Sequence, residues 1–154
     1  MLDRPTSTLM LRPAEIGDAD VILELQRDGF GDDPHCPDRA RLEAAMKNRR
    51  IDIHVAEAGG SVVGYFLLNN RPFRPWTALD YIAVHPVARG LGIGGKMIDR
   101  IVEITRRRQV RLFVRRSNTR AIEFYHRHDF VETGVREGNY FDGEDAIIMV
   151  RRIR

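Results

Sequence analysis

Cysteine, lysine and long apolar runs are all scarce in this 154-residue chain. The single cysteine, Cys36, cannot form an intrachain disulfide, which agrees with a reducing compartment. No stretch approaches the roughly 20 consecutive apolar residues of a membrane helix. The N-terminus also lacks the basic-then-apolar order of a signal peptide. We therefore expect a cytoplasmic protein without a membrane partner.

The positive charges are nearly all arginines, because Lys47 and Lys96 are the only lysines. Arginine binds phosphate through a planar fork of donors, so this composition permits a phosphorylated ligand. The net charge is only +3, and the arginine runs at 106–108 and 151–154 are typical of solvated surface. A basic face with stacking aromatic residues is missing from the pattern, and we expect no nucleic-acid partner.

The hydrophobic content of 43% is enough for one core, and the sequence has no repeats and no linker. We expect residues 1–154 to form one domain. Periodicity and turn residues predict helices at 17–30, 38–48, 93–107 and 117–128. They predict strands at 7–13, 51–58, 61–70, 77–84 and 110–114, followed by a hairpin of 129–141 and 145–152.

Three of these elements carry more specific expectations. Asp18 is predicted to cap the first helix through its side chain. The near-continuous apolar run at 77–84 is typical of a central strand covered on both faces. The hydrophobic closing strand "DAIIMV" (145–150) is predicted at a sheet edge, which leaves a homodimer open beside the monomer.

Four glycines fall within six residues, from Gly90 to Gly95, between a strand and a helix. They satisfy the G-x-G-x-x-G pattern of dinucleotide binding and nearly satisfy the P-loop. Met97 occupies the position at which a P-loop needs a hydroxyl for magnesium. "HPVAR" separates the strand from the first glycine, against the dinucleotide fold, although Arg115 and Arg116 keep an NADP site open.

A third interpretation includes Arg89 in the motif, immediately before the helix. Glycines let an anion approach the backbone closely, and the helix N-terminus adds about half a positive charge. A diphosphate fits such a loop. The alternative is a plain turn, but four glycines weaken a helix N-terminus unless something needs the amides.

Two stretches resemble the GNAT acyltransferase superfamily. Arg89-x-x-Gly92-x-Gly94 is similar to that family's loop for the pyrophosphate of coenzyme A, and "YIAVHP" (81–86) to its central strand. "NTRAIEFYHRHDF" resembles its second signature, with the matching residues Asn118, Ala121, Ile122, Tyr125 and Phe130.

The resemblance implies a single α/β (α+β) GNAT-type domain: a mixed, mostly antiparallel twisted sheet with helices on both faces and one central parallel pair. It implies direct acetyl transfer from acetyl-CoA, as cosubstrate, to a primary amine without a metal. The implied coenzyme-binding residues are Ile82, Ala83, Val84, Arg89, Gly90, Leu91, Gly92, Ile93, Gly94, Gly95 and Asn118.

The same resemblance makes Tyr125 the acid that protonates the leaving thiolate, a core tyrosine being the alternative. It gives the Val84 amide the role of steadying the oxyanion, and Asn118 that of binding the pantetheine arm or capping its helix. For the base we expect Asp80, which shares the strand parity of Ile82 and Val84 and so faces the cleft. An exposed or hydrogen-bonded strand carboxylate is the alternative.

The tail at 136–150 resembles the ribosomal-protein alanine N-acetyltransferases and related protein N-terminal enzymes. In that case Tyr140 helps to bind the incoming N-terminus, a cross-strand aromatic pair being the alternative. Phe113 stands where that subgroup carries a glutamate base, and Asp129 replaces a glycine expected in a left-handed conformation.

The missing glutamate leaves several functions open. A different base, such as Asp80 acting through water, would preserve a protein N-terminus as acceptor. A small-molecule amine and a non-catalytic acyl-CoA sensor are the alternatives. We expect the acceptor to contact residues 26–38, 71–76 and 136–142, whose pattern does not identify the ligand.

Overall fold

The computed structural model describes residues 9–31 and 33–153. Within them the chain forms a seven-stranded sheet in the order β1-β2-β3-β4-β5-β7-β6. The strands are β1 (Met10–Pro13), β2 (Ile51–Ala58), β3 (Ser61–Asn69), β4 (Trp76–Val84), β5 (Gln109–Arg115), β6 (Val131–Arg136) and β7 (Ala146–Arg152). The helices are α1 (Ala19–Phe30), α2 (Arg39–Lys47), α3 (Ile93–Ile104) and α4 (Thr119–Arg127), with short 3-10 turns η1 (Ile16–Asp18) and η2 (Pro86–Ala88).

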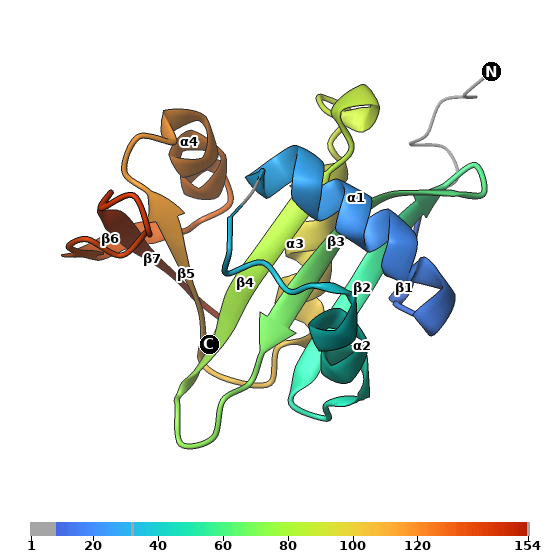
Figure 1. Cartoon of the computed structure of the whole chain (residues 1–154). Helices are drawn as coiled ribbons and strands as arrows, with labels where there is room; N and C mark the ends of the chain where they lie inside the picture. Colours follow the sequence, from blue (N-terminus) through green and yellow to red (C-terminus); the bar gives the residue numbers. More distant parts are fainter. Residues whose placement is uncertain (1–8, 32, 154) are drawn as a thin grey trace.

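The sheet is antiparallel at every pairing except β4 with β5, which are parallel. Helices α1 and α2 cover one face of the sheet, and α3 covers the other (Figure 1). This arrangement confirms the expected fold class. The first predicted strand began at residue 7, but residues 7 and 8 lie outside the described part of the chain.

The sheet separates two hydrophobic clusters, and successive strand residues alternate between them. The larger cluster, under α3 and α4, includes Leu79, Ile98, Leu112, Phe130 and Met149. The smaller cluster, under α1 and α2, includes Ile22, Leu25, Leu42, Val55 and Tyr65. Because β4 contributes residues to both clusters, its backbone is held firmly at the centre of the fold, as the apolar run at 77–84 predicts.

Strands β4 and β5 are paired only over a short stretch. The pairs are Trp76 with Gln109, Thr77 with Val110 and Ala78 with Arg111. Beyond Ala78 the two strands have no pairing, so the edge of β4 that carries residues 82–84 is not occupied by β5. This separation opens the sheet at its centre.

A β-bulge lies in β4 at the same level. Leu67 on β3 pairs with Tyr81, whereas the next residue, Leu68, pairs with Leu79, so Asp80 is the extra residue. The bulge reverses the alternation of side chains, and Leu79 packs in the same cluster as Ile82 and Val84. The regular alternation by which we expected Asp80 to share a face with Ile82 and Val84 is therefore interrupted at Asp80 itself.

Two further expectations are corrected by the fold. Asp18 stands at the N-cap of α1, but its side chain makes no cap hydrogen bond. It accepts hydrogen bonds from Arg12 Nη1 and Nη2 at 2.8 and 3.0 Å and from the Glu15 amide at 2.7 Å. The buried Asp18 thus joins β1 to the start of α1, because its carboxylate accepts from Arg12 and the Glu15 amide instead of from the amides of the helix.

The closing strand β7 is not at an edge, since it pairs with β5 on one side and β6 on the other. The hairpin turns outward, which makes β6 the edge strand, and all six residues of β6 are exposed.

Helix α3 ends at Ile104, earlier than expected, and Thr105 donates its hydroxyl to the Ile101 carbonyl. In the described residues no helix has both the length and the apolar content needed to cross a bilayer.

Candidate active site

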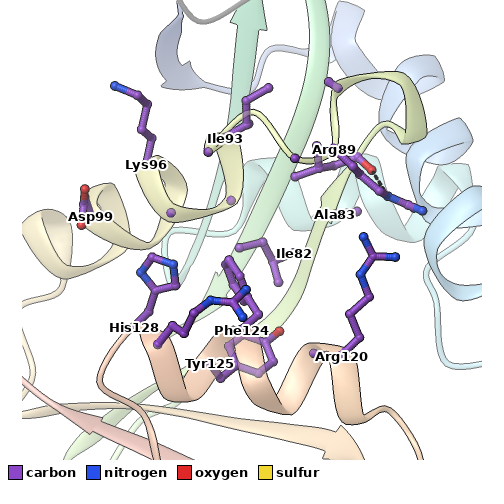
Figure 2. Close-up of a pocket in the computed structure, with 18 of the residues that line it drawn as sticks. Ile82, Ala83, Arg89, Ile93, Lys96, Asp99, Arg120, Phe124, Tyr125 and His128 are labelled. Atoms are coloured by element: carbon purple, nitrogen blue, oxygen red, sulfur yellow. Dashed lines mark hydrogen bonds between the residues drawn. The ribbon is translucent and has the colours of Figure 1, made fainter.

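A cavity of about 860 Å³ lies where the glycine loop, β4 and α4 meet (Figure 2). One wall is the β4 edge at Ile82, Ala83 and Val84, and the opposite wall is α4. The loop from Arg89 to Gly95 closes the cavity, except that Leu91 is 39% exposed and does not line it. Of the expected coenzyme-binding residues, all but Leu91 therefore border one cavity.

The loop conformation depends on Gly90 and Gly92. Their φ angles are +81° and +78°, in the region that side chains with a Cβ rarely adopt. Gly92 is the N-cap of the 12-residue helix α3, and its left-handed backbone turns the chain into the helix. The first amides of α3 have no intrahelical partner and carry the positive end of the helix dipole. The loop therefore suits a bound anion.

Gly94 and Gly95 serve a different purpose, which the sequence pattern concealed. A Cβ at Gly95 would lie 2.9 Å from His128 Cε1, and one at Gly94 would lie 3.0 Å from Phe124 Cζ. Both glycines let α4 side chains approach the first turn of α3. Only half of the glycine cluster is thus explained by loop conformation.

Four cationic side chains border the cavity: Arg89, Lys96, Arg120 and Arg127. Asp99 is the one acidic residue among the described residues that line it. Arg89 Nε donates to the Val84 carbonyl at 3.2 Å, the hydrogen bond drawn in Figure 2. The excess of positive charge favours an anionic ligand.

Sequence analysis missed three of these cations, although a signal was present. Arg120 and Arg127 are seven residues apart, which places them on one face of α4, and Lys96 lies in the first turn of α3. The spacing along α4 was the usable clue. Only the tertiary structure places α4 opposite α3 across the cavity.

Tyr125 is 9% exposed and packs in the larger cluster, and it also borders the cavity. Its ring meets Phe124 and Phe130 edge to face, with centroids 5.4 and 5.5 Å apart. The hydroxyl points into the space between α4 and β4 (Figure 2). Burial, and secondarily the Tyr140 phenol, raise the pKa of Tyr125, so it is protonated at neutral pH.

The two interpretations of Tyr125 are therefore compatible, since the ring packs in the core while the hydroxyl reaches the cavity. Asn118 likewise lies where both of its expected roles are compatible, at the N-cap of α4 and at the cavity wall. Its Oδ1 accepts from the Ala121 amide at 3.1 Å as the N-cap of α4, and the residue lines the cavity.

Asp80 does not line this cavity. It borders a second one of about 280 Å³, together with Trp76, Arg111 and Phe113. Although the residue is exposed, desolvation by the surrounding atoms raises the pKa of its carboxyl; the charge of Arg71 and a hydrogen bond from Asn69 act in the opposite direction. A raised pKa suits a general base that works near neutral pH.

The two cavities border consecutive parts of β4. The second cavity ends at Asp80, and the glycine-loop cavity begins at Ile82. The bulge that reverses the side-chain alternation lies between them. Neighbouring residues of one strand thus contribute to the walls of two cavities.

Tyr140 lies in the loop between β6 and β7, beyond the cross-strand pairs, so the alternative of a paired hairpin aromatic is wrong. The Arg115 guanidinium lies 4.1 Å from the centre of its ring. Arg115 also donates to Asp142 Oδ2 at 2.8 Å and to Glu144 Oε1 at 2.9 Å. These contacts fix the loop, but Tyr140 does not line either of the two cavities.

Two departures from the family pattern have different consequences. Asp129 has a φ of +66°, so it adopts the left-handed conformation expected for the glycine that it replaces. Phe113 is 41% exposed and borders the second cavity. No carboxylate replaces the missing glutamate at that position, and Asp80 is the one acid among the described residues lining this cavity.

The sequence profile of the Acetyltransferase (GNAT) family matches residues 19–130. This chain therefore belongs to the GNAT acetyltransferase family, whose members are acetyl-CoA-dependent N-acetyltransferases. The match confirms the resemblance and the expected class of enzyme. It covers both signatures and the preceding elements from α1 onward.

Three relatives illustrate the range of acceptors within the family. The 5-NmdU N-acetyltransferase of Pseudomonas phage PaMx11 is 39% identical over 82 residues, which are 53% of this chain and 59%, less than two thirds, of the phage protein. N-alpha-acetyltransferase RimI of Mycobacterium tuberculosis is 32% identical over 139 residues, covering 87% of this chain and 86% of RimI.

A solved structure of spermidine N-acetyltransferase from Vibrio cholerae, in complex with CoA and spermine, superposes with a TM-score of 0.80. It is 21% identical and covers 95% of this chain and 96% of that one, so it shows the shared fold. The names of the three relatives specify three different acceptors. Membership in the family thus defines N-acetylation of amines and does not specify the acceptor.

Proposed function

We propose that this chain transfers the acetyl group of acetyl-CoA directly to the primary amine of an acceptor. The observation that carries the proposal is the composition of the 860 Å³ cavity, which joins the glycine loop, the unpaired edge of β4 and the hydroxyl of Tyr125. A diphosphate-bearing thioester needs an anion site at one end and a proton donor at the other. These residues supply both.

The residues present fit coenzyme A in charge and shape. The amides from Gly90 to Gly95 and the N-terminus of α3 would hold the diphosphate, while Arg120 and Arg127 face the remaining phosphate. The edge of β4 at 82–84 has no strand beside it and would pair with the pantetheine arm. When bound, acetyl-CoA supplies an activated acetyl thioester.

In the proposed reaction Asp80 accepts a proton from the acceptor ammonium through a water molecule. The free amine nitrogen then bonds to the acetyl carbon, and the carbon–sulfur bond breaks. The nitrogen loses its second proton, which passes through water to Tyr125 and restores the phenol after it has protonated the sulfur. Tyr125 donates its proton to the departing sulfur, and the amide of Val84 donates to the oxygen on which charge develops. The acetylated acceptor and free CoA are the products, and the proposal involves neither a metal nor an acyl-enzyme.

The acceptor is either a protein N-terminus or a small amine. A protein N-terminus is supported by the similarity to the mycobacterial N-alpha-acetyltransferase over most of both chains. A small amine is supported by the second cavity, because Phe113 takes the place of the glutamate base and arginines surround it. Both candidates require the same coenzyme site.

Release of free CoA measured against a panel of peptides and small amines tests the proposal. We expect acetyl-CoA-dependent turnover with at least one amine and acetyl-CoA binding tighter than that of NADP. Tight acetyl-CoA binding without turnover on any acceptor would instead make the chain an acyl-CoA sensor. Tighter binding of NADP would show that the glycine loop serves a dinucleotide.

A further inference from the structure

The second cavity is unusually rich in arginine for a site that receives an amine. Arg71, Arg74, Arg111 and Arg136 border its 280 Å³, and Asp80 is the one acid among the described residues that line it. These side chains come from the β3–β4 loop, from β5 and from the end of β6. Segments far apart in the sequence thus bring four positive charges to one place.

Two aromatic rings hold three of the guanidinium groups in a stack. Arg74 and Arg111 lie 5.4 and 4.6 Å from the centre of the Trp76 ring. Arg111 and Arg136 lie 5.7 and 5.3 Å from the centre of the Phe113 ring. Cation–π contacts of this kind orient a guanidinium without consuming its N–H donors. Phe113, which replaces the expected glutamate, therefore serves to position arginines.

These arginines form no ion pair in the described part of the chain, although the charge of Arg71 acts on the Asp80 carboxyl. The ion pairs of residues 9–31 and 33–153 involve none of the four arginines. Arg111 Nε is buried and has no hydrogen-bond partner there. A buried charged donor without a partner is costly, since its hydration is lost and nothing replaces it. A bound anion would restore the missing hydrogen bonds.

We infer that the arginine stack binds an acidic group of the acceptor, so that the substrate is a small primary amine that also carries a phosphate or a carboxylate. This inference rests on the proposed function. The acidic group would lie among Arg74, Arg111 and Arg136, and the amine would lie at Asp80. From Asp80 the path to the glycine-loop cavity is short, because Ile82, two residues further along β4, already borders it.

The charge distribution also opposes a polyamine as the acceptor. A polycation placed along the cavity would bring several ammonium groups beside four arginines, with one carboxylate to offset the repulsion. The fold shared with a spermidine enzyme does not bear on this point, because charge in the acceptor cavity differs independently of fold. Electrostatic repulsion is a direct means of rejecting a wrong substrate.

Matched amines test the inference in the full-length chain. We expect KM for O-phosphoethanolamine to lie about tenfold or more below KM for ethanolamine, the gain of one charged hydrogen-bonded contact. β-Alanine distinguishes a carboxylate site from a phosphate site, and spermidine should be the poorest acceptor. Equal KM values for the charged and neutral amines, or a preference for spermidine, would overturn the inference.

Variants of the stack assign the effect to these residues. Arg111→Met should raise KM for O-phosphoethanolamine about tenfold or more, with KM for ethanolamine and Kd for acetyl-CoA unchanged. Arg136→Gln, at the exposed end of the stack, should act in the same direction and does not disturb the core. Arg106→Gln, an exposed arginine outside both cavities, is the matched control.

Calorimetry separates this inference from the proposed function. If CoA release fails with every amine, the proposed function fails. O-Phosphoethanolamine should still bind the wild-type chain and bind at least tenfold more weakly to the Arg111→Met variant. Binding that is absent, or that is equal in the two proteins, would overturn the arginine site, whatever the outcome of the turnover assay.

Discussion

Asp80, the extra residue of the β4 bulge, and Tyr125 border two different cavities. Asp80 lies in the bulge and borders the arginine-lined cavity, while Ile82 and Tyr125 border the glycine-loop cavity. The proposed base in one cavity and the proposed acid in the other match the order of the proposed reaction, because the amine loses a proton before the sulfur gains one. The following predictions test this division of roles and the framework that holds it.

Replacing Tyr125 with phenylalanine should lower kcat by about 10²- to 10⁴-fold, the usual contribution of a general acid. The ring contacts with Phe124 and Phe130 remain, so the melting temperature should hardly change. Kd for acetyl-CoA, measured by calorimetry, should also stay within about twofold. A variant that melts at a much lower temperature and retains kcat would make Tyr125 a purely structural residue.

Asp80 should control the acidic limb of the rate profile. The carboxylate must be ionised to accept a proton, and its pKa is raised above the ordinary value of 3.8 by desolvation. We therefore expect kcat/KM to increase with pH through this raised pKa and to reach a plateau above it. Asp80→Asn should remove the limb and lower kcat/KM by about 10²- to 10⁴-fold.

Two variants control the assignment of that limb to Asp80. The positive charge of Arg71 lowers the pKa of Asp80, so Arg71→Gln should move the limb to higher pH, as seen in a full pH profile with ethanolamine. Glu24→Gln, an exposed acid on α1 outside both cavities, should leave the profile unchanged. A limb that persists in Asp80→Asn would assign the base to another group.

Gly92→Ala should destabilise the chain by about 1–2 kcal/mol, because φ at this position is +78° and a Cβ there is strained in the left-handed region. The free energy of unfolding in urea measures this cost. Gly92→Asn is the matched control, since asparagine tolerates the conformation better. Kd for acetyl-CoA should rise in the order glycine, asparagine, alanine. Equal stability of the two variants would contradict the argument from backbone strain.

Asp18→Asn should lower the free energy of unfolding at pH 7 by about 1.5–3 kcal/mol, through loss of the charged hydrogen bonds with Arg12. Those bonds hold the pKa of Asp18 below its ordinary value of 3.8. A carboxyl with a depressed pKa contributes stability above its unfolded pKa and loses it as the pH falls through the folded one. The difference between wild type and variant should therefore shrink below about pH 3.8. A difference that stays constant into acid would contradict the linkage.

The order of elements and the coenzyme loop were predictable, because each depends on local chemistry. The apolar periodicity of α3, the turn at Gly59-Gly60 and the glycines before α3 are properties of short segments. Asn118 at the start of α4 is likewise a local cap. The family signatures then added the expectation that the loop and Tyr125 belong to the same site, which periodicity alone does not provide.

The errors occurred where one residue changes a long-range register or finds a distant partner. The parity of Asp80 was misjudged, because a bulge depends on how β3 pairs with β4 and not on the β4 sequence. The capping role of Asp18 was misjudged because its carboxylate accepts a hydrogen bond from Arg12 on β1. The edge position of the closing strand β7 was misjudged because β6 pairs with β7 on the side away from β5.

By itself, the amino-acid pattern determined the succession of helices and strands and the glycine loop before α3, and the family resemblance added the phenol at position 125 as the expected acid. Tertiary structure alone decided that Arg74, Arg111 and Arg136 stack around Trp76 and Phe113 beside Asp80. The physical reason is the range of the interactions. Backbone conformation and helix capping are fixed within a few residues, whereas a cluster of like charges from three separate segments exists only after the sheet has formed.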